Sequence, residues 1–281
     1  MLLNTLTLHS PKNTLEAAKL FAELKDVKIL AGGTFLLNSM KLLKSKGIKT
    51  ANNVLSLAKA KDLKGIYLNN GLLTIKAMTT ITELFESDLT VDNLNILHTV
   101  CRDISTNPIR NMATVGGNLT CRYTWTEMGA VMIALDAQMH FLSAEGKESR
   151  ITAEDFFKNA ARSEQLFTHV GIQHDPTAII TYRRVKKTIN VDVPLLAVCV
   201  KTNLRNNQWS NTRVSINNGT AFAQRDHTLE EFLNQSRSSP DLGARALEHL
   251  SKDIYDIRSS EYKQHMFRVS IQSAISEISQ G

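Results

Sequence analysis

Short strand-like and helix-like segments alternate along the first 175 residues, which limits the chain to folds that mix both elements. From Asn13 onward, apolar residues recur at helical spacing, and Glu16 stands where a capping box needs it. A short apolar run over residues 27–31 follows, then Gly-Gly-Thr at 32–34, then a second amphipathic segment over 35–46. This order predicts a helix, a strand, a tight turn and a second helix.

The alternation continues in the middle of the chain. Residues 65–68 and 72–77 flank an Asn-Asn-Gly sequence at 69–71, which predicts a β-hairpin. Thr80 and Glu83 then have the spacing of a capping box at the start of a helix. Another helix face is predicted from Leu94, Leu97, Cys101 and Ile104, and residues 128–135 also have a helical pattern.

The pattern changes near residues 173–177. Long strand-like runs follow over 178–185, 193–204 and 209–216, and helical signals dominate the end, with a final helix over 260–278. We therefore expect an α+β fold with a domain boundary between residues 175 and 176. The C-terminal domain, residues 176–281, should be a small α+β unit of an antiparallel sheet plus helices.

Composition excludes several classes of protein. The 281 residues carry 33 Lys and Arg against 27 Asp and Glu, and the net charge of +6 is too weak for a dedicated nucleic-acid-binding protein. The longest apolar run, residues 193–200, falls well short of the roughly 18 residues that span a bilayer as a helix. The N-terminus lacks a secretory-signal pattern. Three widely spaced cysteines indicate reduced thiols and a cytoplasmic location: Cys101, Cys121 and Cys199.

Signatures of metal binding and of hydrolytic catalysis are missing from the sequence. It contains no Cys-x-x-Cys and no His-x-x-x-His, so we predict no metal site on this chain. No Ser-His-Asp arrangement is visible, and His98 and His140 sit in apolar patterns that favour core or boundary positions over a role as catalytic base. We therefore assign no catalytic residue.

Two adjacent glycine pairs, Gly32-Gly33 and Gly116-Gly117, are candidates for binding an anion. Small or hydroxyl residues flank each pair, so bare backbone amides could approach a diphosphate closely. Thr34 could add a hydroxyl, and the helix after the first pair could add its positive end. Either pair alone also suits an ordinary tight turn, but two together favour the diphosphate interpretation. Neither pair has the spacing of a Walker loop or of a Rossmann fingerprint.

The strings LAGGTFLLNSMK at 30–41 and IRNMATVGGNL at 109–119 carry a family resemblance. Together with IKAMTTITEL at 75–84, ALDA at 134–137 and EYKQHMFRVSIQSAISE near the C-terminus, they resemble the FAD-binding (medium) subunit of molybdenum hydroxylases. This family is of the xanthine dehydrogenase and carbon monoxide dehydrogenase type. The resemblance covers nearly the whole chain.

The resemblance implies a more specific fold than the α+β class alone. It implies a two-subdomain FAD-binding domain of the vanillyl-alcohol oxidase (PCMH) kind over residues 1–175, with subdomains at about 1–57 and 58–175. A C-terminal domain of the carbon monoxide dehydrogenase flavoprotein kind would follow over 176–281.

The resemblance also implies which residues bind FAD. The two glycine segments of the family would hold the diphosphate here, and three further positions would contact the cofactor. The implied set is Lys28, Ile29, Leu30, Ala31, Gly32, Gly33, Thr34, Phe35, Thr114, Val115, Gly116, Gly117, Asn118, Glu127, Ile172 and Arg184. Lys187 offers an alternative register to Arg184, because the run YRRVKK at 182–187 allows more than one alignment.

The chain departs from the family pattern in three places. Phe35 stands where the family usually has Asp, Glu127 replaces a usual Asp, and CRYTWT at 121–126 replaces a segment of small residues. In this last segment, Tyr123 and Trp125 could cover a flavin ring, face a partner or simply pack inside the protein. We expect the segment to lie beside the flavin or its entrance.

The function implied by the resemblance is electron transfer within a hetero-oligomeric oxidoreductase. Electrons would pass from a molybdenum cofactor on a large partner subunit, through [2Fe-2S] clusters on a small partner subunit, to noncovalent FAD on this chain. The terminal acceptor would be NAD, a quinone or oxygen. Two alternatives stay open: a stand-alone FAD-dependent oxidoreductase, and a flavin-free structural or assembly subunit.

Overall fold

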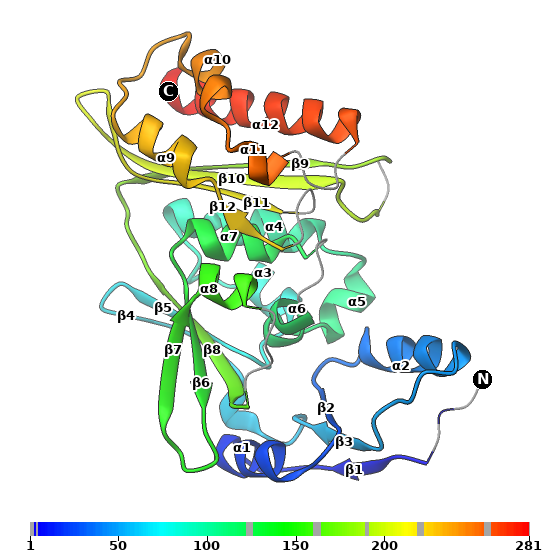
Figure 1. Ribbon diagram of the computed structural model, residues 1–281. Helices are drawn as coiled ribbons and strands as arrows, with labels where there is room; N and C mark the ends of the chain where they lie inside the picture. The colour runs from blue at the N-terminus through cyan, green and yellow to red at the C-terminus, as the bar shows by residue number, and fades with distance from the viewer. Residues whose placement is uncertain are drawn as a thin grey trace.

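The computed structural model describes residues 3, 5–121, 126–159, 164–188, 191–217, 222–255 and 260–280. These residues form three β-sheets, of three, five and four strands, and helices cover parts of each. Figure 1 shows the three sheets one above another, from the N-terminal sheet at the bottom to the C-terminal sheet at the top. The mixture of strands and helices follows the predicted alternation.

The first subdomain is a small parallel sheet with two helices. Its strands have the order β1-β3-β2 and are β1 (Thr7–His9), β3 (Asn53–Ser56) and β2 (Val27–Leu30). Helix α1 (Thr14–Glu23) begins where the side chain of Asn13 accepts a hydrogen bond from the N–H of Glu16. Helix α2 (Leu36–Ser45) follows β2 after a short turn. The predicted order of helix, strand, turn and helix is therefore confirmed.

The second subdomain is a five-stranded antiparallel sheet. Its order is β4-β5-β8-β6-β7, and its strands are β4 (Ile66–Asn69), β5 (Leu72–Lys76), β8 (Leu166–Gln173), β6 (Gln138–Leu142) and β7 (Glu148–Thr152). The predicted hairpin joins β4 to β5, and Asn70 and Gly71 both have positive φ angles, of 50° and 76°. An Asn-Gly pair adopts such angles at little cost, which explains why this local signal was reliable.

Short helices connect the strands of the second subdomain. They are the 3₁₀ turns η1 (Lys61–Leu63) and η2 (Asp92–Asn95), and the helices α3 (Ile81–Phe85), α4 (Ile96–Asp103), α5 (Asn107–Met112), α6 (Val115–Cys121), α7 (Met128–Ala134) and α8 (Ala153–Lys158). The predicted capping box is present at α3, where the Thr80 hydroxyl accepts from the N–H of Glu83 and the Glu83 carboxylate accepts from the N–H of Thr80.

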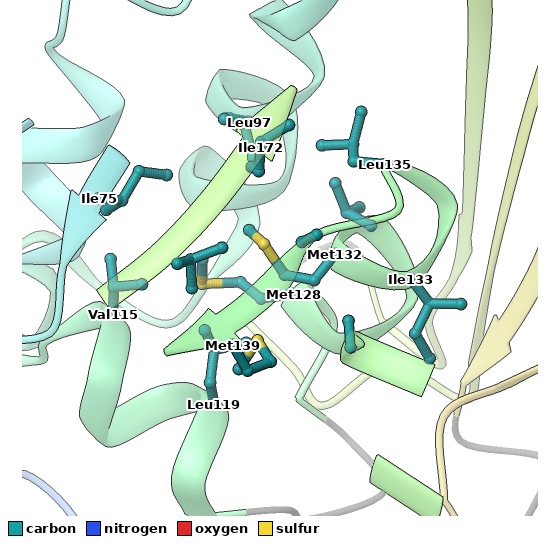
Figure 2. Close-up of a cluster of buried hydrophobic side chains, with 14 of the residues drawn as sticks. Ile75, Leu97, Val115, Leu119, Met128, Met132, Ile133, Leu135, Met139 and Ile172 are labelled. Carbon is teal, nitrogen blue, oxygen red and sulfur yellow. The ribbon is translucent and has the colours of Figure 1, made fainter. Parts of the chain in front are cut away.

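The main hydrophobic core lies between this sheet and helices α4, α6 and α7. Figure 2 shows Val115 and Leu119 of α6, Met128 and Met132 of α7 and Ile172 of β8 gathered in it. All seven residues of α7 are buried. A helix that is apolar on every side must be covered on every side, and α7 achieves this by lying between two sheets.

The C-terminal sheet supplies the second cover for α7. Its order is β12-β11-β10-β9, with β9 (Ala178–Val185), β10 (Leu196–Arg205), β11 (Gln208–Asn217) and β12 (Gln224–Arg225). Buried Cys199 belongs to the same core as α7, whereas Val198 and Val200 pack into a separate core on the opposite face. Helices cover that face: α9 (His227–Asn234), α10 (Leu242–Ala246), η3 (Leu247–His249), α11 (Lys252–Tyr255) and α12 (Glu261–Gln280).

The predicted start of the second long strand is wrong by three residues. We expected a strand from residue 193, but β10 begins at Leu196, after an exposed Val193. Pro194 explains the later start, because proline has no N–H to donate to a ladder of hydrogen bonds. The chain passes from the five-stranded to the four-stranded sheet between Gln173 and Ala178, and the domain boundary at 175/176 stays a prediction. In the part of the chain that the structure describes, no helix is long and apolar enough to cross a membrane.

We expect Met132→Ala to lower the free energy of unfolding by about 2–5 kcal/mol, because truncating a buried side chain leaves a cavity. Met112→Ala removes the same atoms from a side chain that is 57% exposed, so its cost should stay below about 0.5 kcal/mol. Urea unfolding of both variants, followed by circular dichroism, measures the difference. Equal losses would contradict the burial of α7 between the two sheets.

Candidate functional site

A cleft of about 620 Å³ lies between the first and second subdomains. Its volume is in the range of sites for small molecules and cofactors. Eleven of the sixteen residues predicted to bind the cofactor line it: Lys28, Ile29, Ala31, Gly32, Gly33, Thr34, Phe35, Thr114, Gly116, Gly117 and Asn118. The structure thus brings both glycine pairs, which are far apart in the sequence, into the wall of one cavity.

The first glycine pair forms a tight turn after β2. Gly33 has a φ of 72°, and a side chain there would contact only Leu30 within 4 Å. Gly32 lies so close to α5 that a Cβ atom would be 1.9 Å from the carbonyl oxygen of Met112. Both positions therefore need glycine, one for its backbone angle and the other for the close approach of two backbones.

The turn presents three consecutive N–H groups. No described residue accepts a hydrogen bond from the backbone N–H of Gly32, Gly33 or Thr34. Successive amides in such a turn form a concave donor surface that suits an anion. Lys28 is the one charged residue among the described residues that line the cleft. This wall can therefore bind a negatively charged group through backbone donors and one ammonium group.

The second glycine pair does not form the loop that we expected. Gly116 and Gly117 lie in the first turn of helix α6. The N–H of Gly116 donates to the carbonyl of Ala77 (2.8 Å), and the N–H of Gly117 donates to the hydroxyl of Thr114 (3.1 Å). These amides are engaged within the protein, so the prediction of bare donors at this pair is wrong. The Thr114 hydroxyl, which caps the first turn as threonine commonly does, was the sequence signal for this helix start.

The second pair instead allows α6 to approach its neighbours. A Cβ atom on Gly116 would lie 2.7 Å from the carbonyl oxygen of Ala77. On Gly117 it would lie 2.9 Å from the Thr114 hydroxyl and 3.7 Å from the Cβ of Ala31. A contact of 2.7 Å with a backbone atom cannot be accommodated without a shift, so glycine at 116 lets α6 approach residue 77, just after β5, while the distance from Gly117 to Ala31 is an ordinary contact.

The cleft also contains a polar atom that lacks a partner. The Oδ1 atom of Asn118 is buried and has no hydrogen-bond partner in the described structure. An unsatisfied buried polar atom costs free energy unless a ligand or water binds it. Phe141, Phe156 and Phe167 contribute apolar rings to the lining. Backbone donors, an unpaired amide and aromatic side chains together fit a ligand with an anionic group and a flat apolar ring system, as FAD has.

Helix α2 contributes a part of the wall that the sequence did not lead us to assign. Leu36, Ser39, Met40 and Leu43 line the cleft and follow one another at helical spacing on one face of α2. That spacing was visible in the sequence. It predicts an amphipathic helix, but it does not indicate which surface the apolar face covers.

Five of the predicted residues do not line the cleft. They are Leu30, Val115, Glu127, Ile172 and Arg184. Val115 and Ile172 are fully buried in the main core, where their side chains pack against other apolar residues. For all five residues, contact with the cofactor stays a prediction.

Glu127 and Arg184 form a buried ion pair with each other. The Nε atom of Arg184 is 2.6 Å from Oε1 of Glu127, and the Tyr182 hydroxyl donates to Oε2 at 2.8 Å. Arg184 also donates to the carbonyl of Asp192 at 2.9 Å. Burial raises the pKa of Glu127 to about 7, although the Arg184 charge and the Tyr182 hydrogen bond act in the opposite direction. The pair joins β9 to the start of α7 and so connects the C-terminal sheet to the second subdomain.

The segment at 121–126 begins and ends at the cleft. Cys121 and Thr126 line it, and the side chain of Asn217 donates to the carbonyl of Thr126 at 2.6 Å. Tyr123 and Trp125 lie outside the described residues, so their predicted place beside the cofactor stays a prediction.

The two histidines considered as bases lie outside the described cleft lining. His98 contacts the carbonyl of Ser87 at 3.2 Å, and His140 stacks on His169 with ring centroids 4.1 Å apart. In the described ranges of the chain, no group of three His, Cys, Asp or Glu side chains is placed to hold a metal ion.

Comparison with known proteins identifies relatives of the chain. The family model described as "FAD binding domain in molybdopterin dehydrogenase" matches residues 4–181, more than half of the chain. The nicotine 6-hydroxylase medium subunit of Paenarthrobacter nicotinovorans is 26% identical over 281 residues, which cover 95% of each chain. The carbon monoxide dehydrogenase medium chain of Hydrogenophaga pseudoflava is 32% identical over 152 residues, 53% of this chain and 50% of that one.

Solved structures share the fold over the full length. A chain of a Cu,Mo-CO dehydrogenase superposes with a TM-score of 0.87 at 24% identity, covering 100% of this chain and 99% of that one. Quinoline 2-oxidoreductase from Pseudomonas putida 86 also gives 0.87, at 20% identity and with the same coverage. At such identities the likeness shows the fold alone, and it confirms the predicted fold class.

We expect Arg184→Gln to destabilise the protein by about 3–5 kcal/mol near pH 8, because it leaves the Glu127 carboxylate buried without a counter-charge. Without the guanidinium, the pKa of Glu127 should rise further above its ordinary value of 4.5. A group with a raised pKa in the folded state favours folding when protonated, and this stability is lost as the pH rises through that pKa. The loss in the free energy of unfolding that Arg184→Gln causes should therefore be smaller near pH 5.

Arg183→Gln is the matched control. Arg183 pairs with the exposed Glu277, so its loss should cost no more than about 1 kcal/mol at either pH. Urea unfolding of the wild type and both variants at the two pH values measures these differences. If the loss of stability in Arg184→Gln were the same at both pH values, the role of the buried pair would be contradicted.

Proposed function

The chain belongs to the family of FAD-binding domains in molybdopterin dehydrogenases, and we propose that it binds one FAD noncovalently in the cleft between its first two subdomains. The proposal places the diphosphate against residues 32–34 and the ring systems along the apolar walls. Its part in the complex is that of an electron-transfer subunit.

The observation that carries this proposal is the row of three N–H donors at Gly32, Gly33 and Thr34. Adjacent amides of residues that line a cleft, with no acceptor among the described residues, need a ligand or water to satisfy them. A diphosphate accepts several such hydrogen bonds at once, and the ammonium of Lys28 would offset part of its charge. Gly32 cannot be replaced without separating the two backbones, so this glycine lets the turn lie directly against residue 112.

The other residues of the cleft would orient the cofactor and exclude water. A hydrogen-bond donor of FAD would satisfy the unpaired side-chain oxygen of Asn118. The inner face of α2 and the three phenylalanine rings would surround the apolar parts of the cofactor. Bound FAD supplies the redox chemistry, and the residues of this chain supply position and electrostatic environment.

We propose that the partners are a large subunit with a molybdenum cofactor and a small subunit with [2Fe-2S] clusters. Support comes from the names of the relatives, several of which are a medium subunit or medium chain of a dehydrogenase or hydroxylase. Electrons would leave the FAD for NAD, a quinone or oxygen. A cytoplasmic complex agrees with the three cysteines, which are all free thiols, two of them buried.

A flavin-free structural subunit is the second candidate. The amides of Gly116 and Gly117 are already engaged within the protein, which leaves the cofactor fewer donors than we expected. Phe35, at the position where the family usually has Asp, also lines the cleft and adds no polar group. A wild-type chain that neither carries flavin when purified nor binds added FAD would favour this candidate.

Gly33→Val tests the proposed site. We expect it to weaken FAD binding by about tenfold or more, because Gly33 lines the cleft and a branched side chain there would strain the positive φ and shift the amides of the turn. The measurements are the ratio of flavin to protein after purification and the quenching of FAD fluorescence on titration.

Gly47→Val is the matched control for backbone strain. Gly47 has the same φ of 72°, and a Cβ atom there meets nothing within 4 Å. Both variants should lose a similar amount of stability, on the order of 1–2 kcal/mol, but only Gly33→Val should lose flavin. Equal flavin affinity in the two variants would show that the amide row does not bind the cofactor.

A further inference from the structure

The positive charge of the chain is concentrated around helix α2. Residues 27–61 contain seven lysines and no Asp or Glu, whereas the whole chain has a net charge of only +6. The rest of the molecule is therefore close to neutral. The seven are Lys28, Lys41, Lys44, Lys46, Lys49, Lys59 and Lys61.

Helix α2 has almost no packing of its own away from the cleft. Of its ten residues, all within the described part of the chain, Met40 alone is buried. Its apolar stripe faces the cleft, which leaves the opposite face to solvent. Figure 1 shows α2 at the outer edge of the molecule, near α5. We define the outer α2 surface as Leu37, Lys41, Leu42, Lys46, Ile48 and Lys49.

The outer α2 surface combines exposed apolar side chains with three lysines. Leu42 is 56% exposed and Ile48 is 51% exposed, and Leu37 is also exposed. Lys41 and Lys46 form no ion pair with the residues that the structure describes. Lys49 lies 3.9 Å from Asp26, but both side chains are more than 70% exposed, and such a pair contributes little.

We propose that the outer α2 surface docks an acidic protein surface of a partner subunit, a step that rests on the function proposed above. Protein interfaces combine an apolar centre with a polar rim, and lysines at the rim would select a partner of opposite charge. The leucines and the isoleucine would form the apolar contact, and Lys41, Lys46 and Lys49 would face carboxylates.

A membrane is a poorer match for the same surface. Helices that bind in the membrane interface have a wide apolar face opposite a charged face. In α2 the apolar stripe is turned inward to the cleft, so only Leu37 and Leu42, interspersed with polar residues, remain on the outer side of the helix. This apolar area is too small to insert into acyl chains but suits contact with another protein.

Docking at this surface would place the partner directly behind one wall of the cofactor cleft. The inner face of α2 lines the cleft through Leu36, Ser39, Met40 and Leu43, and its outer face carries the docking residues. A single helix would then separate the partner from the bound cofactor, about 10 Å across with its side chains. Such a separation suits a subunit that exchanges electrons with this chain.

The test is Lys41→Glu/Lys46→Glu in the assembled complex, prepared by co-expression with the large and small subunits. We expect the double variant to associate about tenfold more weakly than the wild type at low ionic strength, because reversed charges repel an acidic partner. The difference should shrink at about 0.5 M salt, where surface charges are screened. Lys147→Glu/Lys252→Glu makes the same charge change at exposed lysines on other elements and should associate like the wild type.

Flavin content separates this inference from the proposed function. The double variant should keep the flavin-to-protein ratio of the wild type, since neither lysine lines the cleft. If the wild type carries flavin and assembles, but both double variants associate with the subunits as tightly as the wild type does, the proposed docking surface is wrong and the proposed function stands. A wild type without flavin would instead contradict the function. If Lys41→Glu/Lys46→Glu lost the binding to phosphatidylserine vesicles that the wild type shows, while its association with the subunits stayed unchanged, the docking proposal would be overturned in favour of a membrane.

Discussion

The backbones of the first two subdomains meet at Gly32, where a Cβ atom would lie 1.9 Å from the carbonyl oxygen of Met112. A second close approach, between Gly116 and the carbonyl of Ala77, fixes α6 against β5. Together these contacts hold the turn at 32–34 opposite the start of α6. The width of the cleft depends on the first of them, because a side chain at Gly32 would push the backbones of the two subdomains apart.

The C-terminal sheet stabilises this arrangement from the other side of α7. It covers the helix that the second subdomain alone leaves half exposed, and the Glu127–Arg184 pair joins the two layers next to the segment at 121–126. The third layer therefore positions residues at the cleft without lining it.

Sequence reasoning was reliable where a signal is local. The Asn-Gly turn at 70–71 and the capping box of Thr80 and Glu83 depend only on neighbouring residues, and both are present as predicted. The pair at 116–117 differs from the prediction because the acceptor of Gly116 is the carbonyl of Ala77, which lies far away in the sequence, just after β5. A glycine pair shows that the backbone needs room, but it does not show whether a ligand or another backbone fills that room.

The charged residues illustrate the same limit. The resemblance placed Glu127 and Arg184 near the cofactor, whereas the structure pairs them with each other outside the cleft lining. Their partner Tyr182 was not singled out at all, although it stands two residues before Arg184 on the same face of β9. The contact depends on how two domains meet, and no sequence pattern within either domain encodes that meeting.

Amide hydrogen exchange with and without FAD measures whether the amides of residues 32–34 bind the cofactor. We expect FAD to slow exchange at residues 32–34 and along α2, while exchange in β10 and β11 of the C-terminal sheet stays unchanged. Unchanged exchange at 32–34 in a chain that binds FAD, or protection confined to the C-terminal sheet, would contradict this expectation.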